Sequence, residues 1–181
     1  MGSTWRMATH FRSASTERRW RFDDRQHHQS CSPARQRCKR GAQAACIGRS
    51  RGGLSTKLHA AVDGKGNPQR FLLSPGQDSD IRHAKALLKD LNALFLIGDK
   101  GYDSQSFVSD LKSQGILAVI PSRQNRKIQR YYNRKLYKDR NGVERFFARL
   151  KQFRRITTRY EKKAENYLAM VYIASTRLLL K

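Results

Sequence analysis

Four functional side chains recur at helical spacing within one short segment of the sequence. They are Tyr137, Arg140, Glu144 and Lys151. At about 100° per residue, these offsets bring all four to within roughly 60° of one another on a helix. The larger apolar residues of the segment fall on an adjoining face, so the stripe should follow the edge of a buried surface. Glu144 would then be half-shielded from water.

An ordinary amphipathic helix with a polar flank would show the same periodicity. Asn141-Gly142 is also a candidate helix cap, and a helix that begins there would leave Tyr137 and Arg140 on the approaching chain. The spacing alone therefore leaves both a functional stripe and a solvated face open.

A second acid follows an apolar run further upstream. The run begins at Leu94 and ends abruptly at Asp99, which is followed by a turn containing Gly101. This pattern predicts a buried strand with Asp99 at its carboxyl end, where sites lie in open α/β sheets. A turn former or helix cap would also place an aspartate here.

The other elements can be predicted from periodicity and from turn residues. We expect strands at 54–62, 69–73, 94–99 and 116–120, and helices at about 78–91, 104–114, around Glu144, and at 166–180. The last of these contains Arg177 and is too short to span a membrane.

The amino-terminal segment 1–46 differs from the rest of the chain. It contains no Val, Leu or Ile, yet it holds both tryptophans and all three cysteines. Such a segment cannot bury an aliphatic core, so we expect 1–46 to be atypical and disordered, or read out of frame. The foldable part is then 47–181, which has room for one domain of ordinary size.

The formal net charge is +24, which predicts binding to nucleic acid or another polyanion. Residues 123–135 interleave cations with two tyrosines, as a loop beside a DNA backbone would; a solvated linker would look similar. The DNA-binding candidates in this loop are Arg123, Arg126, Lys127, Arg130, Arg134 and Lys135.

Together these segments resemble the DDE transposases of bacterial insertion sequences, in the branch that includes insertion-sequence family five. The resemblance runs from Gly48 to Lys181. It rests on the Gly/Arg stretch 48–57, on Asp99-Lys100-Gly101-Tyr102-Asp103, and on the four-residue signature of 137–151. It implies an α/β fold, an RNase H-like mixed sheet with flanking helices.

The resemblance also implies a function. Such enzymes cleave DNA and transfer strands at the ends of their own mobile element, using Mg²⁺ or Mn²⁺. Asp99 and Glu144 would be the second and third acids of the catalytic triad and would bind the metal, while Tyr137, Arg140 and Lys151 would position phosphates. The expected partners are the element ends and target DNA, with a homo-oligomer as the complete protein and a bacterial cytoplasmic, nucleoid-associated location.

The first acid of the triad is where the sequence departs from the family. The family carries Asp-Ser-Thr on an early strand, and no Asp-Ser-Thr occurs in this chain. The acidic candidates near that place are Asp23, Asp24 and Asp63, of which Asp63 opens a predicted hairpin turn at the wrong end of the sheet. We therefore expect the first central strand to be missing and this chain alone to be truncated or inactive.

A shifted reading frame would explain the departure. If Asp23 to Gln36 are back-translated and shifted by one nucleotide, permitted codons allow Met-Ile-Asp-Ser-Thr-Ile-Lys-Ala-Ala-His-Gln. The alternative function is a non-catalytic basic protein that binds nucleic acid through the loop and helix alone. Replacing Asp99 or Glu144 would leave its activity intact.

Overall fold

The computed structural model describes residues 19–21, 28–31, 45–50 and 53–180. Its strands are β1 (Arg19–Arg21), β2 (His28–Cys31), β3 (Gly48–Ser50), β4 (Gly53–Val62), β5 (Pro68–Pro75), β6 (Phe95–Ile97), β7 (Leu117–Val119) and β8 (Thr158–Arg159). Its helices are α1 (Ile81–Leu88), α2 (Gln105–Ser113), α3 (Arg134–Tyr137), α4 (Asn141–Leu150), α5 (Arg154–Thr157) and α6 (Ala164–Leu179), with short 3₁₀ helices η3 (Lys100–Tyr102) and η4 (Lys138–Arg140).

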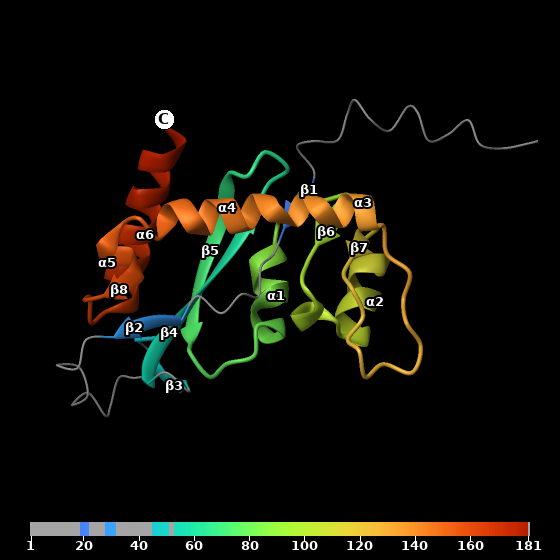
Figure 1. The fold of residues 1–181 in the computed structure, drawn as a ribbon, viewed down its shortest axis with the longest axis horizontal. Coiled ribbons are helices and arrows are strands. Elements are labelled where there is room, and N and C mark those ends of the chain that lie inside the picture. Colours follow the sequence, from blue (N-terminus) through green and yellow to red (C-terminus); the bar gives the residue numbers. More distant parts are fainter. Residues whose placement is uncertain (1–18, 22–27, 32–44, 51–52, 181) are drawn as a thin grey trace, which may run out of the picture.

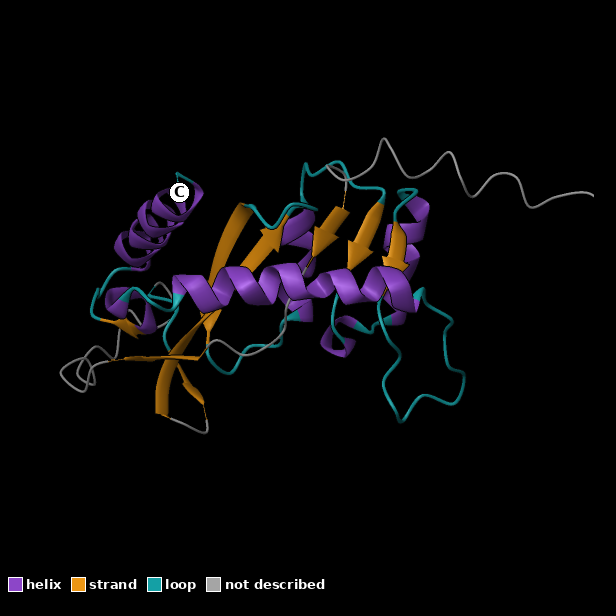
Figure 2. Ribbon diagram, turned by 45° about the horizontal axis from the view of Figure 1, so that its top comes forward, coloured by secondary structure: helices purple, strands orange, loops and turns teal. Residues whose placement is uncertain are grey.

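The strands form one mixed sheet in the order β7-β6-β1-β4-β2-β8, with β3 and β5 also paired to β4. Strands β1, β6 and β7 run parallel, whereas β4 runs antiparallel to both β1 and β5. Figure 2 shows the parallel strands side by side behind the long helix. The expected mixed α/β architecture is confirmed, and the strands and helices expected between residues 54 and 180 all form with small shifts at their ends.

The expectation of a missing central strand is wrong. Strand β1 lies between β4 and β6, with Trp20 in register with Leu96 and Arg21 in register with both Ile97 and Val62. Backbone N–H and C=O groups make this pairing, so it does not require Val, Leu or Ile. The proposed boundary between 1–46 and 47–181 stays a prediction.

Each face of the sheet carries its own apolar core. On one face, α1 and α2 pack with Leu87, Leu96 and Phe107 in a buried cluster. On the other face, α4 and α6 pack with Phe146 and Val171 in a second cluster. Figure 1 shows α4 crossing the strands on that second face. Among the described residues, no helix is long and apolar enough to cross a membrane.

A buried polar cluster fastens the start of α1 to the sheet. Lys57 on β4 donates from Nζ to the Asp78 carbonyl at 2.6 Å and to Oδ1 of Asp80 at 3.1 Å. His59 hydrogen-bonds through Nε2 to Oγ of Ser74 at 2.8 Å, and its ring lies 5.0 Å from that of His83. Burial, followed by the charges of His83 and Lys57, lowers the pKa of His59 to about 3. His59 is therefore buried and hydrogen-bonded beside a partly exposed His83.

Acidification is therefore expected to destabilise the fold through His59. The unfolded chain binds a proton at this side chain near its ordinary pKa of 6.5, whereas the folded chain binds it only near 3. The stabilisation is present above pH 6.5 and is lost as the pH falls towards 3, amounting to about 2 kcal/mol between pH 7 and pH 5. Urea titrations at pH 7 and pH 5 measure the free energy of unfolding. Its decrease between the two pH values should be smaller by this amount in His59→Gln than in the parent chain. Equal losses in the two proteins would contradict the assignment.

Candidate active site

Asp99 lies where the apolar run ends, two residues beyond β6. It caps η3, because Oδ1 accepts a hydrogen bond from the Gly101 N–H at 2.9 Å. Its side chain is 17% exposed, and the other oxygen faces Arg140. The aspartate therefore serves both as the turn former that the sequence allowed and as a carboxylate at the carboxyl end of a parallel strand.

The chain from α3 through η4 to α4 forms one almost continuous helix, and Figure 1 shows it as a single rod. Asn133 caps its start by accepting hydrogen bonds from the N–H groups of Lys135 and Leu136 at 3.0 and 3.2 Å. The prediction of a cap at Asn141-Gly142 is wrong, since Asn141 has helical dihedral angles. A helix that is already under way needs no second cap there, so Tyr137 and Arg140 lie on the rod.

The apolar face of this rod fixes the orientation of Glu144. Val143, Phe146, Phe147 and Leu150 are all buried in the core of the second face. Glu144 lies at the edge of that surface with its side chain 21% exposed. The predicted stripe along a buried edge is therefore confirmed for this residue.

Arg140 connects the two acids. Its Nη2 lies 2.5 Å from Oε1 of Glu144, one helical turn away, and its Nη1 lies 4.0 Å from Oδ2 of Asp99. The guanidinium also stands over the ring of Tyr137, with 5.5 Å from Cζ to the ring centroid. Tyr137 in turn meets the ring of Tyr132 edge-on at 5.4 Å. The structure thus brings together three of the four signature residues with Asp99.

Lys151 lies apart from this group. It follows α4 as its C-cap, is exposed, and accepts a hydrogen bond at its carbonyl from Oγ1 of Thr157 at 2.6 Å. At 1.5 Å per residue, it stands about 10 Å along the helix from Glu144. Lys151 therefore lies further along the rod and does not join the group around Asp99 and Glu144.

Asp63 is occupied elsewhere. Its carboxylate accepts hydrogen bonds from the N–H groups of Lys65 and Asn67 at 2.8 and 2.9 Å, and so closes the turn between β4 and β5. The predicted hairpin turn is confirmed. Asp23 and Asp24 lie outside the described residues.

The six candidate cations of the basic loop divide into two sets. Arg123, Arg126 and Arg130 hydrogen-bond or ion-pair with groups of residues 100–105. Lys127 in the loop is exposed, as are Arg134 and Lys135, which lie on α3 and not in the expected loop; Arg123 is exposed as well. Sequence reasoning treated all six alike, and it missed Asp103, the buried acid that the first set contacts.

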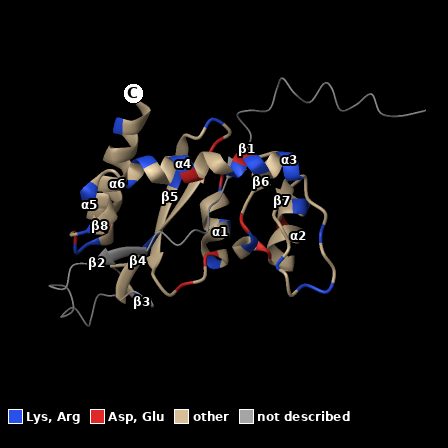
Figure 3. Cartoon of the chain, viewed as in Figure 1, with Lys and Arg blue, Asp and Glu red and all other residues tan. Residues whose placement is uncertain are grey.

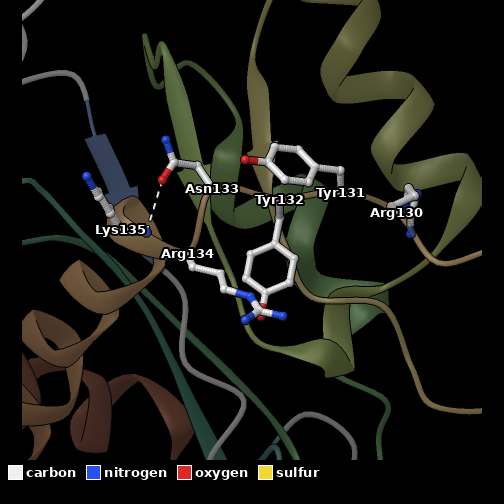
Figure 4. Close-up of a pocket in the computed structure, with 6 residues that line it drawn as sticks. All are labelled: Arg130, Tyr131, Tyr132, Asn133, Arg134 and Lys135. Carbon is white, nitrogen blue, oxygen red and sulfur yellow. Dashed lines mark hydrogen bonds between the residues drawn. The ribbon is translucent and has the colours of Figure 1, made fainter.

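A hollow of about 570 Å³ is lined by Arg130, Tyr131, Tyr132, Asn133, Arg134 and Lys135. Figure 4 shows the two tyrosine rings between Arg130 and the start of α3. Tyr131 is 96% exposed. Figure 3 shows lysine and arginine along this loop and over the neighbouring helix. The hollow therefore offers cations and aromatic surface together, which suits a nucleic-acid strand.

A family model described as a transposase DDE domain matches residues 20–179. The chain belongs to the DDE transposase family. This match begins at residue 20, whereas the motifs identified in the sequence begin at Gly48. A putative transposase for insertion sequence element IS6501 from Brucella ovis is 35% identical over 133 residues, which is 71% of this chain and 100% of that protein.

Family membership assigns this DDE transposase to DNA transposition, with DNA as its partner. Within its described residues, no group of three or more His, Cys, Asp or Glu side chains is placed to hold a metal ion. Asp99 and Glu144 are thus a pair of carboxylates with an arginine between them. Hard oxygen ligands of this kind suit Mg²⁺ or Mn²⁺.

Proposed function

We propose that this protein catalyses metal-dependent DNA cleavage and strand transfer at the ends of an insertion sequence. The observation that carries the proposal is the meeting of Asp99, Arg140 and Glu144. The two acids are separated by a helix, a strand and the basic loop in the sequence, yet one guanidinium reaches both of them. The order β5-β4-β1-β6-β7, antiparallel up to β1 and parallel beyond it, supports an RNase H-like core.

Asp99 and Glu144 would hold the Mg²⁺ or Mn²⁺ ions. Both side chains are partly exposed and present only oxygen atoms, which fits a hard cation that keeps several waters. When bound, such ions activate the attacking oxygen and stabilise the leaving oxygen of a phosphodiester. The pair is one carboxylate short of a triad, so the donor set among the described residues is incomplete.

The remaining signature residues would position the DNA. Arg140 can bind a phosphate with two hydrogen bonds, and its guanidinium packs over the Tyr137 ring. Lys151 would contact a phosphate further along the strand as a point charge. The exposed cations Lys127 in the loop and Arg134 and Lys135 at the start of α3 would contact the DNA backbone. A homo-oligomer would join the two ends of the element.

We propose that this chain alone is inactive because its first acid is not in place. If Asp23 acted as the first acid, that proposal would be wrong, so Asp23 is the residue to replace. In the sequence it follows Arg21, the last residue of β1, by two positions, and Asp99 follows Ile97 by the same offset. Arg21 and Ile97 are register partners in neighbouring parallel strands.

The decisive experiment compares this chain with a second protein, in which the coding frame of residues 23–36 is shifted by one nucleotide to restore Asp-Ser-Thr. Both are incubated with labelled duplexes carrying the element ends, in Mg²⁺ and in Mn²⁺. We expect cleavage only by the restored protein. Sequencing the gene through codon 47 in all frames shows whether that reading is natural.

Two other results would change the proposal. Cleavage by the present chain that disappears in Asp23→Asn would make Asp23 the first acid. Tight DNA binding without cleavage by either protein would favour the non-catalytic nucleic-acid-binding alternative.

A further inference from the structure

We propose that Asp103 is a positioning residue that fastens the basic loop 121–133 to the turn behind Asp99, and so determines which loop cations face DNA. The part of this inference that concerns DNA rests on the proposed function. The part that concerns the loop stands on the contacts of Asp103 itself.

Asp103 is a buried carboxylate held entirely by the loop. Its side chain is 0% exposed. Oδ2 accepts hydrogen bonds from the Arg123 backbone N–H at 2.8 Å and from Nε of Arg126 at 3.0 Å, and Oδ1 contacts the guanidinium of Arg130. Burying a carboxylate is costly unless it is paired and hydrogen-bonded. The loop supplies that pairing, so loop and carboxylate stabilise each other.

Further contacts join the same two segments. The Arg123 side chain donates to the carbonyls of Lys100 and Gly101 at 3.2 and 3.0 Å. Arg126 and Arg130 both reach Oε1 of Gln105, at 3.1 and 3.5 Å. Three arginines of the loop therefore contact η3, Asp103 or the start of α2, and Arg126 and Arg130 are partly buried by these contacts whereas Arg123 is exposed.

The turn that receives them is the one that Asp99 begins. Asp99 is the N-cap of η3 and Asp103 is its C-cap, so the two carboxylates stand at opposite ends of one short turn. A loop fastened at Asp103 is thereby set in place relative to Asp99. Of the six candidate cations, Lys127 in the loop and Arg134 and Lys135 at the start of α3 are exposed and stand outside this set of contacts.

Asp103→Asn is the direct test, because it removes the charge and keeps the shape. Arg126 and Arg130 would be released to solvent and to DNA. We expect trypsin to cut within 123–130 about ten times faster, since local opening would cost roughly 1.4 kcal/mol less. The salt dependence of binding to a labelled duplex of arbitrary sequence should steepen by about 1 to 2 in the log–log slope.

The control is Asp110→Asn on α2. Asp110 forms an exposed ion pair with Lys85, 2.5 Å between Oδ2 and Nζ, so this variant also loses one carboxylate and one ion pair. Its loop proteolysis should match that of the parent chain. A merely destabilising effect of Asp103→Asn would raise proteolysis throughout the chain and would not steepen the salt slope.

A second pair of variants keeps the inference testable if Asp103→Asn fails to fold. Lys127→Gln should lower the salt slope by about 0.9, the value for one lost phosphate contact. Arg126→Gln should leave the slope nearly unchanged and should speed loop proteolysis. Equal slope losses in the two variants, with unchanged proteolysis in Arg126→Gln, would overturn the inference. If the parent chain does not bind DNA at all, the proposed function fails, while proteolysis still decides the role of Asp103.

Discussion

Replacing Glu144 with glutamine is expected to weaken Mn²⁺ binding at least about tenfold and to reduce cleavage by the restored protein at least about 100-fold. Asp99→Asn should have the same effect. Each substitution replaces one of the two carboxylates beside Arg140 with a neutral amide. The amide has no negative charge to balance that of the metal ion, so the ion binds more weakly. Isothermal titration with Mn²⁺ measures the first quantity even if this chain does not cleave DNA.

Glu165→Gln is the matched control, because Glu165 is exposed in the first turn of α6, a different element from those that carry Asp99 and Glu144. It should leave both quantities unchanged. DNA binding should persist or strengthen slightly in Glu144→Gln, since a negative charge is lost beside the proposed path of the DNA. Unchanged Mn²⁺ affinity and cleavage in both active-site variants would exclude these acids as metal ligands and favour the non-catalytic alternative.

Arg159→Met is expected to lower the free energy of unfolding by about 3 kcal/mol. Arg159 is 0% exposed. Its guanidinium donates to Oγ1 of Thr56 at 2.6 Å and to the carbonyls of Glu161 and Lys162 at 3.1 and 3.2 Å. The guanidinium also packs over the Tyr167 ring, with 5.1 Å from Cζ to the ring centroid. Methionine would fill much of this space, but it would not donate hydrogen bonds to these acceptors.

Urea denaturation at constant pH measures this change. Arg154→Met is the comparison, because Arg154 is exposed at the start of α5 and the same substitution there should change stability by less than about 0.5 kcal/mol. A loss of similar size in both variants would mean that the buried contacts of Arg159 do not stabilise the fold.

The sequence was sufficient for elements whose residues carry a strong period or a clear end. The apolar run before Asp99 and the apolar face beside Glu144 specified β6 and α4, and the turn residues around Asp63 specified the hairpin. The family resemblance then selected Asp99 and Glu144 from the acids available. In each of these cases the information lies within a few consecutive residues.

The features that the sequence did not reveal depend on partners far away in the chain. Strand β1 is hydrogen-bonded between β4 and β6. The composition of residues 1–46 does not indicate this pairing. Asn133 caps the long helix although Asn141 looked equally suitable. The loop arginines looked like DNA ligands, because nothing near them in the sequence shows that Asp103 would be buried against them.

The rod formed by α3, η4 and α4 limits how this gene can change over time. Each inserted or deleted residue within it would turn everything downstream by about 100° relative to what lies upstream. One such change between Arg140 and Glu144 would therefore separate the guanidinium from its carboxylate and expose part of the apolar face. A single substitution in this rod leaves the relative orientation of the other side chains unchanged, whereas a change in length does not. Among related transposases, length differences should therefore accumulate in neighbouring loops such as 121–133 and be rare between residues 134 and 150.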